Sequence, residues 1–536
     1  MVALGKGFVT VAHGQVHYRH CGRGPLLVML HDSARSSLQH AASMEWLGEH
    51  FTVLAPDLPG CGVSAPLPVG QRALPDYAAA LAATLTALGV ERCLLYGLGA
   101  GAAVALHYAA HHPARVALAV LDGLESPGPG SGQQSAAHVL EGPVPCDDGS
   151  HLAMAWTRLL DWHRHWPSRP APGVARAGVT LPDDATLHES AVDLFSMGQG
   201  SNDLAEAARR FDAQSAVARL HVPVVQLERD VEPAASVRRT RLLEVLRSAH
   251  LPTSRWQPPT TTRPAARGEW QRYVDLLHGT VRVRLWGDPA DGAPILLLHD
   301  VPGGSASLRD LAAGLAATRP VIAPDLPGLG ESQALPYPSL GSYVSTLAEL
   351  LEALRVTSFD VVAEGLGCTF AIALAAHHPG HVRRMVLDGV TMVRSRERHR
   401  VAQHYCPPAA PDRHGAYLQG LWHQLRNAEF SWPWFERAAE ATRRPEAAPD
   451  PDRRQQQLLD VLKQLPSYGD AARAALEAAV RDLLPAVTQP VLLFDVAGDV
   501  RYASTARAAR RLASSRILPR PATALERAEL AGAFLA

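Results

Sequence analysis

The sequence predicts an α/β protein built from two doubly wound, mostly parallel sheets, each with a helical cap. Three observations predict it: a length of 536 residues, an internal duplication, and strands that alternate with helices in each copy. A chain of this length exceeds one typical domain. Hydrophobic residues at 47% and charged residues at 19% fit globular cores rather than disorder.

The duplication decides the architecture. The segment 26–32, which ends in Leu-His-Asp, returns at 295–300, and the segment 55–64 returns at 323–332 with the same Ala-Pro-Asp-Leu-Pro-Gly start. A glycine-rich turn and a following His-His-Pro recur in the same order. The period is far longer than a solenoid repeat, so each copy should be a complete domain.

A Pro/Thr-rich stretch at 257–268 suits a connector between the copies. We therefore expect domains at 1–262 and 263–536. Within the first copy, short apolar runs predict a hairpin and buried strands, and helical spacing predicts two helices between them. The expected elements are a hairpin at 9–18, strands at 26–31, 51–55, 92–96 and 116–121, and helices at 75–88 and 100–111. This alternation predicts helices on both faces of a parallel sheet.

The order of strand, His-Asp loop, strand, Asp-Leu-Pro-Gly-x-Gly-x-Ser loop, helix, strand and glycine turn resembles the α/β-hydrolase superfamily. The resemblance covers almost the whole chain, twice. It implies caps at about 124–217 and 390–486, inserted after the sixth core strand of each copy.

The turn that carries the nucleophile in active members reads Gly-x-Ser-x-Gly. Here Gly99 is central in the first copy and Gly365 in the second. A glycine has no side chain to form a covalent intermediate, although it tolerates the backbone angles of the turn. We expect the elbows to persist and Gly99, Ala100, Gly365 and Leu366 to line a ligand.

The resemblance also implies a histidine after the last strand, and neither copy has one in place. No histidine follows His423 in the second copy. Acidic residues remain after the seventh strand: Asp230 in the first copy, and Asp495 or Asp499 in the second. Asp499 has the spacing that the resemblance implies for the acid, whereas Asp230 lies two residues short of it. Loss of nucleophile and proton shuttle together removes the usual acyl-enzyme route.

Both copies carry His-Asp where active members often have His-Gly: His31-Asp32 and His299-Asp300. A carboxylate beside the oxyanion pocket opposes an oxyanion, but it suits a general base or the recognition of a cationic or hydroxylated ligand. We name these four residues as candidate catalytic groups. The alternative is that the aspartate only caps the loop that follows it.

The caps supply the remaining candidates. His151 is a candidate catalytic group and Trp156 a candidate ligand contact, with Tyr417 and Trp422 at the equivalent places of the second copy. These side chains can hang over the clefts and hold an aromatic or apolar ligand. The alternative is ordinary packing of the cap on the core.

Charge and cysteine usage exclude other classes. The formal net charge is −1, and no basic tract indicates a nucleic-acid or membrane partner. The six cysteines lack zinc spacing, so we expect no metal and no cofactor. The start lacks an apolar run long enough for a signal peptide, and we expect no membrane span. Cysteines without metal spacing indicate reduced thiols in a cytoplasmic protein, and the abundance of Ala, Arg and Pro suggests a bacterial source. A homo-oligomer remains open.

Two functions stay open. The first is a non-serine enzyme that uses acid/base chemistry on a small organic metabolite, aromatic or acyl, as a lyase, cyclase, isomerase or water-based hydrolase. The second is a pseudo-hydrolase that only binds a ligand or acts as a scaffold. The Gly-x-Gly-x-Gly elbow of the first copy is similar to that of the non-catalytic NDRG-like members, which supports the second hypothesis.

Overall fold

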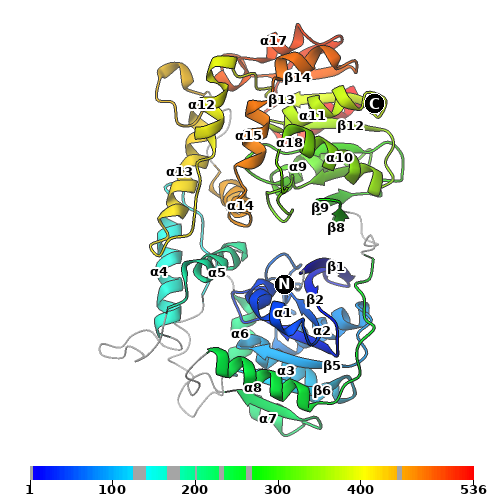
Figure 1. Ribbon diagram of the computed structural model, residues 1–536, viewed down its shortest axis with the longest axis vertical. Coiled ribbons are helices and arrows are strands. Elements are labelled where there is room, and N and C mark those ends of the chain that lie inside the picture. The colour runs from blue at the N-terminus through cyan, green and yellow to red at the C-terminus, as the bar shows by residue number, and fades with distance from the viewer. Residues whose placement is uncertain are drawn as a thin grey trace. The chain divides into compact units, whose positions relative to one another are not determined.

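The computed structural model describes residues 4–124, 140–165, 181–198, 202–227, 235–260, 268–443 and 450–536 (Figure 1). The chain divides into two compact units. The first contains Met1–Val144 and His151–Pro264, and the second contains Pro145–Ser150 and Ala265–Ala536. Asp230 and most of the expected connector lie outside the described residues.

The first unit contains a seven-stranded sheet in the order β1-β2-β4-β3-β5-β6-β7. Only its first strands pair antiparallel, and the strands from β4 to β7 are parallel. The strands are β1 (Gly5–Val11), β2 (Gly14–Cys21), β3 (Leu26–Leu30), β4 (Thr52–Pro56), β5 (Cys93–Leu98), β6 (Val116–Asp122) and β7 (Val224–Leu227). The hairpin and the four buried strands expected from the sequence are confirmed. Continuous apolar runs give strands that are buried on both faces.

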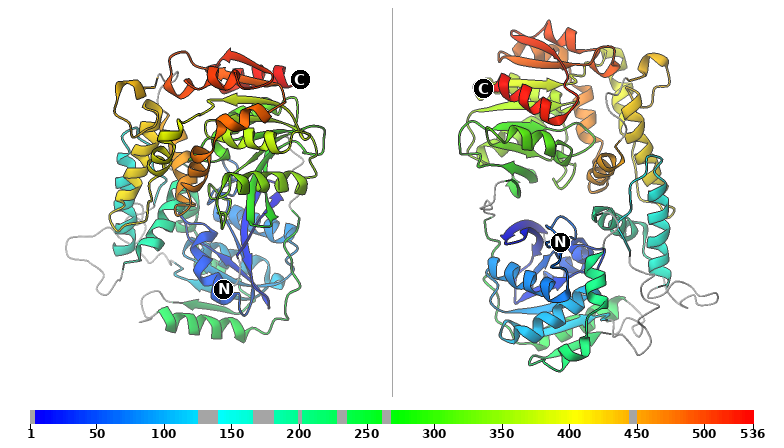
Figure 2. Two further views of the ribbon diagram at one scale, coloured as in Figure 1. Left: turned by 45° about the horizontal axis from the view of Figure 1, so that its top comes forward. Right: turned by 180° about the vertical axis from the view of Figure 1, so that it is seen from behind.

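Helices cover both faces of this sheet, as the pattern of strands and helices predicts (Figures 1 and 2). One apolar core joins the sheet to α2 (Leu74–Ala87) and α3 (Ala100–His111). The other joins it to α1 (Ala41–Leu47) and α8 (Ala235–Ser248). Because each core excludes water from one face, the carboxyl ends of the parallel strands are held in a fixed row.

The second unit repeats this plan with eight strands in the order β15-β14-β13-β12-β10-β11-β9-β8. The strands are β8 (Glu269–Leu276), β9 (Gly279–Trp286), β10 (Ile295–Leu298), β11 (Val321–Pro324), β12 (Phe359–Glu364), β13 (Val382–Asp388), β14 (Val491–Asp495) and β15 (Ser515–Pro519). Helices α9 (Arg309–Leu315) and α18 (Ala524–Leu535) share one core with the sheet. Helices α10 (Leu340–Ala353) and α11 (Gly367–His377) pack against each other.

Helical segments stand between the sixth and seventh core strands of each unit. In the first unit they are α4 (Ser150–His165), α5 (Asp184–Ser196), α6 (Asp203–Arg209) and α7 (Ala213–Val217). In the second unit they are α12 (Ser395–Tyr405), α13 (Ala416–Phe430), α14 (Pro451–Leu462), α15 (Asp470–Glu477) and α16 (Val480–Leu483). Across the described part of the chain, no helix is both long and apolar enough to cross a bilayer.

One short segment departs from the expected domain order. Residues Pro145–Ser150 belong to the second unit although they lie within the first copy of the sequence. The indole of Trp422 donates to the Asp147 carbonyl at 3.0 Å, and the Gln419 amide donates to the Gly149 carbonyl at 2.7 Å. Main-chain carbonyls of this segment are therefore satisfied by side chains of α13, a pairing that periodicity cannot reveal.

Candidate functional site

Both glycine elbows form as sharp strand-to-helix turns. Gly99 lies between β5 and α3 with φ of 57°, and Gly365 lies between β12 and α11 with φ of 56°. The amide of Gly365 donates to the Asp388 carbonyl at 2.8 Å, which ties the turn to the neighbouring strand. Glycine adopts this left-handed backbone without a steric penalty, so the elbow survives the loss of its usual central residue.

In the second unit, the Asp300 side chain fills the place of the missing nucleophile. A Cβ atom added to Gly365 would lie 2.0 Å from Asp300 Oδ1. The same oxygen accepts hydrogen bonds from the amide of Leu366 at 2.8 Å and from the amide of Val301 at 2.9 Å. The carboxylate is therefore held between the elbow and the loop that follows β10.

The first unit repeats this arrangement with Asp32. A Cβ atom on Gly99 would lie 2.1 Å from Asp32 Oδ1. This oxygen accepts from the amides of Ala100 and Ser33, each at 2.8 Å. Both halves of the duplication thus place a carboxylate oxygen on the same two kinds of main-chain donor.

These two donors are the ones that the fold offers to an oxyanion: the amide after the nucleophile position and an amide of the loop after the third strand. The aspartate therefore lies inside the oxyanion pocket rather than beside it. Ala100 and Leu366, which we expected to contact a ligand, donate their amides to Asp32 and Asp300 instead. A negative charge in this pocket repels a developing oxyanion.

Arg501 completes the arrangement in the second unit. Its guanidinium forms an ion pair with Asp300 Oδ2 and would also lie 2.2 Å from a Cβ atom on Gly365. Burial alone would lower the pKa of Arg501, but the facing Asp300 carboxylate raises it above its ordinary value. Sequence reasoning missed Arg501 because no pattern marks a residue that reaches the elbow from the loop after β14.

The positions of the family's acid and histidine are also engaged by arginines. Asp499 Oδ1 accepts from the amide of Arg501 at 2.8 Å, and its other oxygen faces Arg443 at 3.4 Å. The loop after β15, where the histidine is expected, carries Arg520. Arg520 Nε donates to both oxygens of Asp388, at 3.1 and 2.8 Å. An always-charged guanidinium cannot shuttle protons as an imidazole does.

The two histidines proposed for catalysis hold the loop instead. His31 Nδ1 donates to the Asp32 carbonyl at 2.8 Å, and its Nε2 accepts from the amide of Leu58 at 2.8 Å. His299 does the same with Asp300 and Leu326, at 2.8 and 3.0 Å. Both rings are fully buried, with every ring nitrogen bound to the main chain. This geometry contradicts the role in proton transfer that the sequence suggested.

In the cap of the first unit, helix α5 contacts the loop that follows Asp32. The carboxylate of Asp193, on α5, accepts from Arg35 at 2.9 Å and from the Ser36 hydroxyl at 2.5 Å, both in the loop after β3. Figures 1 and 2 place α4 beside α5 and away from strand β5. His151 and Trp156 are buried side chains of α4, so the expectation that they hang over the elbow is not supported.

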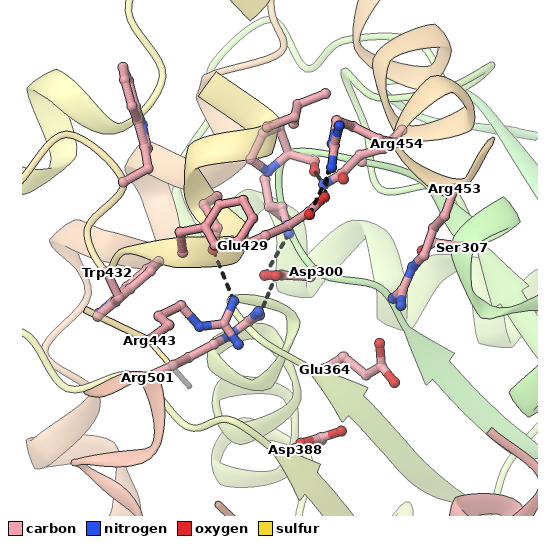
Figure 3. Close-up of a pocket in the computed structure, with 18 of the residues that line it drawn as sticks. Asp300, Ser307, Glu364, Asp388, Glu429, Trp432, Arg443, Arg453, Arg454 and Arg501 are labelled. Atoms are coloured by element: carbon pink, nitrogen blue, oxygen red, sulfur yellow. Dashed lines mark hydrogen bonds and ion pairs between the residues drawn. The ribbon is translucent and has the colours of Figure 1, made fainter. Parts of the chain in front are cut away.

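A pocket of about 280 Å³ opens above the elbow of the second unit (Figure 3). Asp300, Arg443 and Arg501 face the same hollow. Its aromatic wall comes from Tyr405, Phe430, Trp432 and Trp434. Its remaining charged residues are Glu364, Asp388, Glu429, Asp450, Arg453, Arg454, Asp499, Arg520 and Arg527.

Tyr417 and Trp422 do not line this pocket, contrary to expectation. The lining residues of α13 come from its other half, from Gln424 to Phe430. Trp422 is fully buried, and the guanidinium of Arg454 lies over its ring at 4.9 Å from the centroid. The indole therefore supports a buried arginine, which fits the packing alternative.

Two further residues of the elbow region have structural partners. Glu364, at the end of β12, lines the pocket and forms an ion pair with Arg527. Burial raises the pKa of the Cys368 thiol well above its usual value, and the thiol donates to the Ala363 carbonyl at 3.3 Å. A buried neutral thiol favours a packing role for Cys368. In the described ranges, no group of His, Cys, Asp and Glu has the geometry of a metal site.

Comparison with known proteins agrees with this architecture. The family model described as the alpha/beta hydrolase fold matches residues 25–142 and again residues 293–433. A 2-hydroxymuconate semialdehyde hydrolase of Pseudomonas putida is 37% identical over 114 residues, which is 19% of this chain and 38% of that protein. A proline iminopeptidase of Heyndrickxia coagulans is 31% identical over 121 residues, which is 22% of this chain and 41% of that protein.

Each of these matches spans less than half of the relative's own length. Among solved structures, a haloalkane dehalogenase loop variant from Bradyrhizobium elkanii is 20% identical with a TM-score of 0.36, covering 50% of this chain and 96% of that one. The family model matches twice, once in each of the two mostly parallel sheets. The chain belongs to the α/β-hydrolase fold family as a tandem duplication.

Proposed function

We propose that this protein is a non-hydrolytic member of its family, and that the cleft of its second unit binds a small anionic ligand. One observation carries the proposal: in each unit an aspartate oxygen occupies both the place of the nucleophile and the oxyanion donors. A tetrahedral intermediate needs those donors free. With a carboxylate bound to those donors, the cleft cannot stabilise the tetrahedral intermediate from which an acyl-enzyme forms.

The unpaired donors of the cleft favour an anion over a cation, although its acidic residues and its arginines are equal in number. Asp300, Glu364 and Asp388 already pair with arginines, and Glu429 pairs with Arg454. Some hydrogen-bond donors of the arginines, in contrast, have no acceptor in the described part of the chain. Within the described residues, the buried Nε atoms of Arg443 and Arg527 have no acceptor, and the side chain of Arg527 is only 8% exposed. A buried donor without a partner is costly, so a ligand that brings acceptor oxygens is favoured.

The size and walls of the cleft restrict the ligand further. A volume of about 280 Å³ suits a small organic molecule. Phe430, Trp432 and Trp434 offer flat apolar faces to a ring or an acyl chain. A small aromatic or unsaturated carboxylic acid satisfies both the leftover arginine donors and this aromatic wall.

Acid/base catalysis without a nucleophile is the second candidate. It is favoured by Tyr502, whose hydroxyl lines the pocket and donates to Asp388 at 2.6 Å. Such a pair can position a proton for a lyase or isomerase reaction. Burial, with the Asp388 carboxylate close by, raises the pKa of Tyr502, so the hydroxyl stays protonated at neutral pH.

Two measurements on the full chain test the proposal. A fluorophosphonate probe should leave the protein unlabelled, because no activated hydroxyl stands at either elbow. Isothermal titration calorimetry with benzoate should show binding that weakens about tenfold in Arg443→Gln and in Arg527→Gln. Arg383→Gln is the matched control, because Arg383 is exposed near the start of β13 and does not line the pocket.

Labelling by the probe would contradict the proposed loss of hydrolytic function. Equal benzoate affinity in all four proteins would contradict the anion-binding cleft. Conversion of benzoate or of another small carboxylic acid during incubation, lost in Tyr502→Phe, would favour the acid/base candidate instead.

A further inference from the structure

A second hollow of the second unit lies apart from the elbow and contains an unusual concentration of positive charge. Its volume is about 660 Å³, and its walls come from the start of α12, from α16 and from the segment around α17 (Thr505–Ala509). The lining residues are Met392, Val393, Arg394, Ser395, Arg398, Ala478, Val480, Arg481, Arg507, Arg510 and Arg511. We call this hollow the arginine groove.

The groove contains no compensating acid. Its lining includes Arg394, Arg398, Arg481, Arg507, Arg510 and Arg511, and no Asp or Glu of the described residues belongs to it. None of these six guanidinium groups forms an ion pair within the described ranges. The cleft above the elbow differs, since most of its arginines face carboxylates.

The hydrogen bonds inside the groove use only neutral acceptors. Arg398 donates to the Ser395 hydroxyl at 3.2 Å, and Arg507 donates to the Ser504 hydroxyl at 2.8 Å. The buried Nε atom of Arg398 has no acceptor in the described part of the chain. The groove therefore keeps both positive charge and donor capacity for a ligand that supplies acceptor oxygens.

This concentration is local, because the chain as a whole has a formal net charge of −1. Six like charges around one hollow repel one another, so an anion that enters the hollow stabilises the folded state. Guanidinium groups match phosphate oxygens in paired hydrogen bonds, and several of them favour a ligand with more than one phosphate. A nucleic-acid polymer, in contrast, is bound by a broad basic surface, and the sequence contains no basic tract.

An adjoining hollow of about 440 Å³ indicates what the rest of the ligand is. It shares Met392, Val393, Arg394 and Arg507 with the arginine groove. Its other walls include the apolar side chains of Val401, Trp432 and Val500, beside the charged Glu397, Arg400 and Arg501. A flat organic group attached to the phosphates can lie on this apolar surface.

We propose that the arginine groove binds a small molecule that carries two or more phosphate groups on a flat organic moiety, of the nucleoside polyphosphate kind. The arginine groove shares no lining residue with the cleft above the elbow, so phosphate binding there does not depend on the function proposed for that cleft. The adjoining hollow shares Trp432 and Arg501 with the cleft. No bond is made or broken in this step.

Isothermal titration calorimetry of the full chain tests this proposal with ATP and with inorganic tripolyphosphate. We expect both to bind, and ATP to bind more tightly because its base reaches the apolar hollow. Arg398→Gln and the double variant Arg510→Gln/Arg511→Gln should each weaken ATP binding by about tenfold or more. Arg383→Gln should leave the affinity unchanged, and circular dichroism should show that all variants are folded.

Three results would overturn the proposal. The first is no binding of either phosphate compound to the wild type at physiological salt. The second is equal affinity in the groove variants and in Arg383→Gln. The third is a single-stranded oligonucleotide that binds more tightly than ATP, displaces it and loses affinity in the same groove variants, since that identifies a nucleic-acid site.

Discussion

Restoring a serine to the elbow is the most direct perturbation of this structure. In Gly365→Ser, the new Cβ atom would lie 2.0 Å from Asp300 Oδ1 and 2.2 Å from Arg501 Nη2. No side-chain Cβ tolerates such contacts, so the carboxylate must leave its position. The serine itself would stand at φ of 56°, a backbone region that costs about 1 kcal/mol for a residue with a side chain.

The cost of moving the carboxylate follows from its partners. Asp300 would lose the amides of Leu366 and Val301, and each hydrogen bond to a charged acceptor contributes about 1.5–3 kcal/mol. Asp300 is 29% exposed, so water replaces part of that loss. We expect Gly365→Ser to lower the free energy of unfolding by about 3 kcal/mol. In an Asp300→Gly background the same serine should cost about 1 kcal/mol, because the carboxylate is gone and the end of the Arg501 side chain, which has lost its ion-pair partner, can move aside.

Urea unfolding of the four proteins in this cycle measures the coupling, with midpoints and slopes compared together. Gly420→Ser is the control, because a Cβ atom at this exposed position of helix α13 meets nothing within 4 Å. The same experiment with Gly99 and Asp32 should repeat the result in the first unit, where the contact is 2.1 Å. If serine costs the same with and without Asp300, the carboxylate does not fill the nucleophile's place and the reasoning fails.

Three other substitutions test the electrostatics of the folded chain. Burial lowers the pKa of His40 to about 3, so the free energy of unfolding should fall as the pH drops from about 6.5 towards that value. The expected slope is about 1.4 kcal/mol per pH unit, and His40→Phe should flatten it when urea unfolding is measured across this pH range. Burial alone would raise the pKa of Asp388, but Arg520 holds it below its usual value. Asp388→Asn should therefore destabilise at pH 7 by about 3 kcal/mol, and the difference from wild type should shrink below about pH 4, whereas a constant difference would exclude this pairing. Arg454 is fully buried between Glu429 and the Trp422 ring, so Arg454→Ala should cost about 3–5 kcal/mol, and a cost below 1 kcal/mol would contradict its buried pairing.

The sequence predicted the part of the site that is local in the chain. A glycine at the apex of a strand-to-helix turn is visible as a motif, and so is the aspartate after the third strand in each copy. The structure brings Asp32 to Gly99 and Asp300 to Gly365, although each pair is separated by two or more secondary-structure elements. The direction of the aspartate side chain, into the oxyanion pocket, required the coordinates of both loops.

The sequence predictions about histidines and cap aromatics failed for a different reason. The sequence does not specify whether the ring nitrogens of a histidine face a cleft or bind the main chain. In His31 and His299 both ring nitrogens bind the main chain. Helix α13 has pocket-facing and buried residues at close spacing, and Trp422 belongs to the buried set. The burial of a side chain and its hydrogen-bond partners depend on which other elements pack against it, and the sequence alone does not state that.

The sequence by itself determined the duplication, the alternation of strands and helices, and the two glycine elbows, because these depend on repeats and periodicities along the chain. Only the tertiary structure decided which charged side chains lie together. Arg501 reaches Asp300 from the loop after β14, and the arginine groove collects side chains from α12, α16 and α17. Scattered arginines leave no tract in the sequence, and they become a site only when folding brings distant segments within the range of their electric fields.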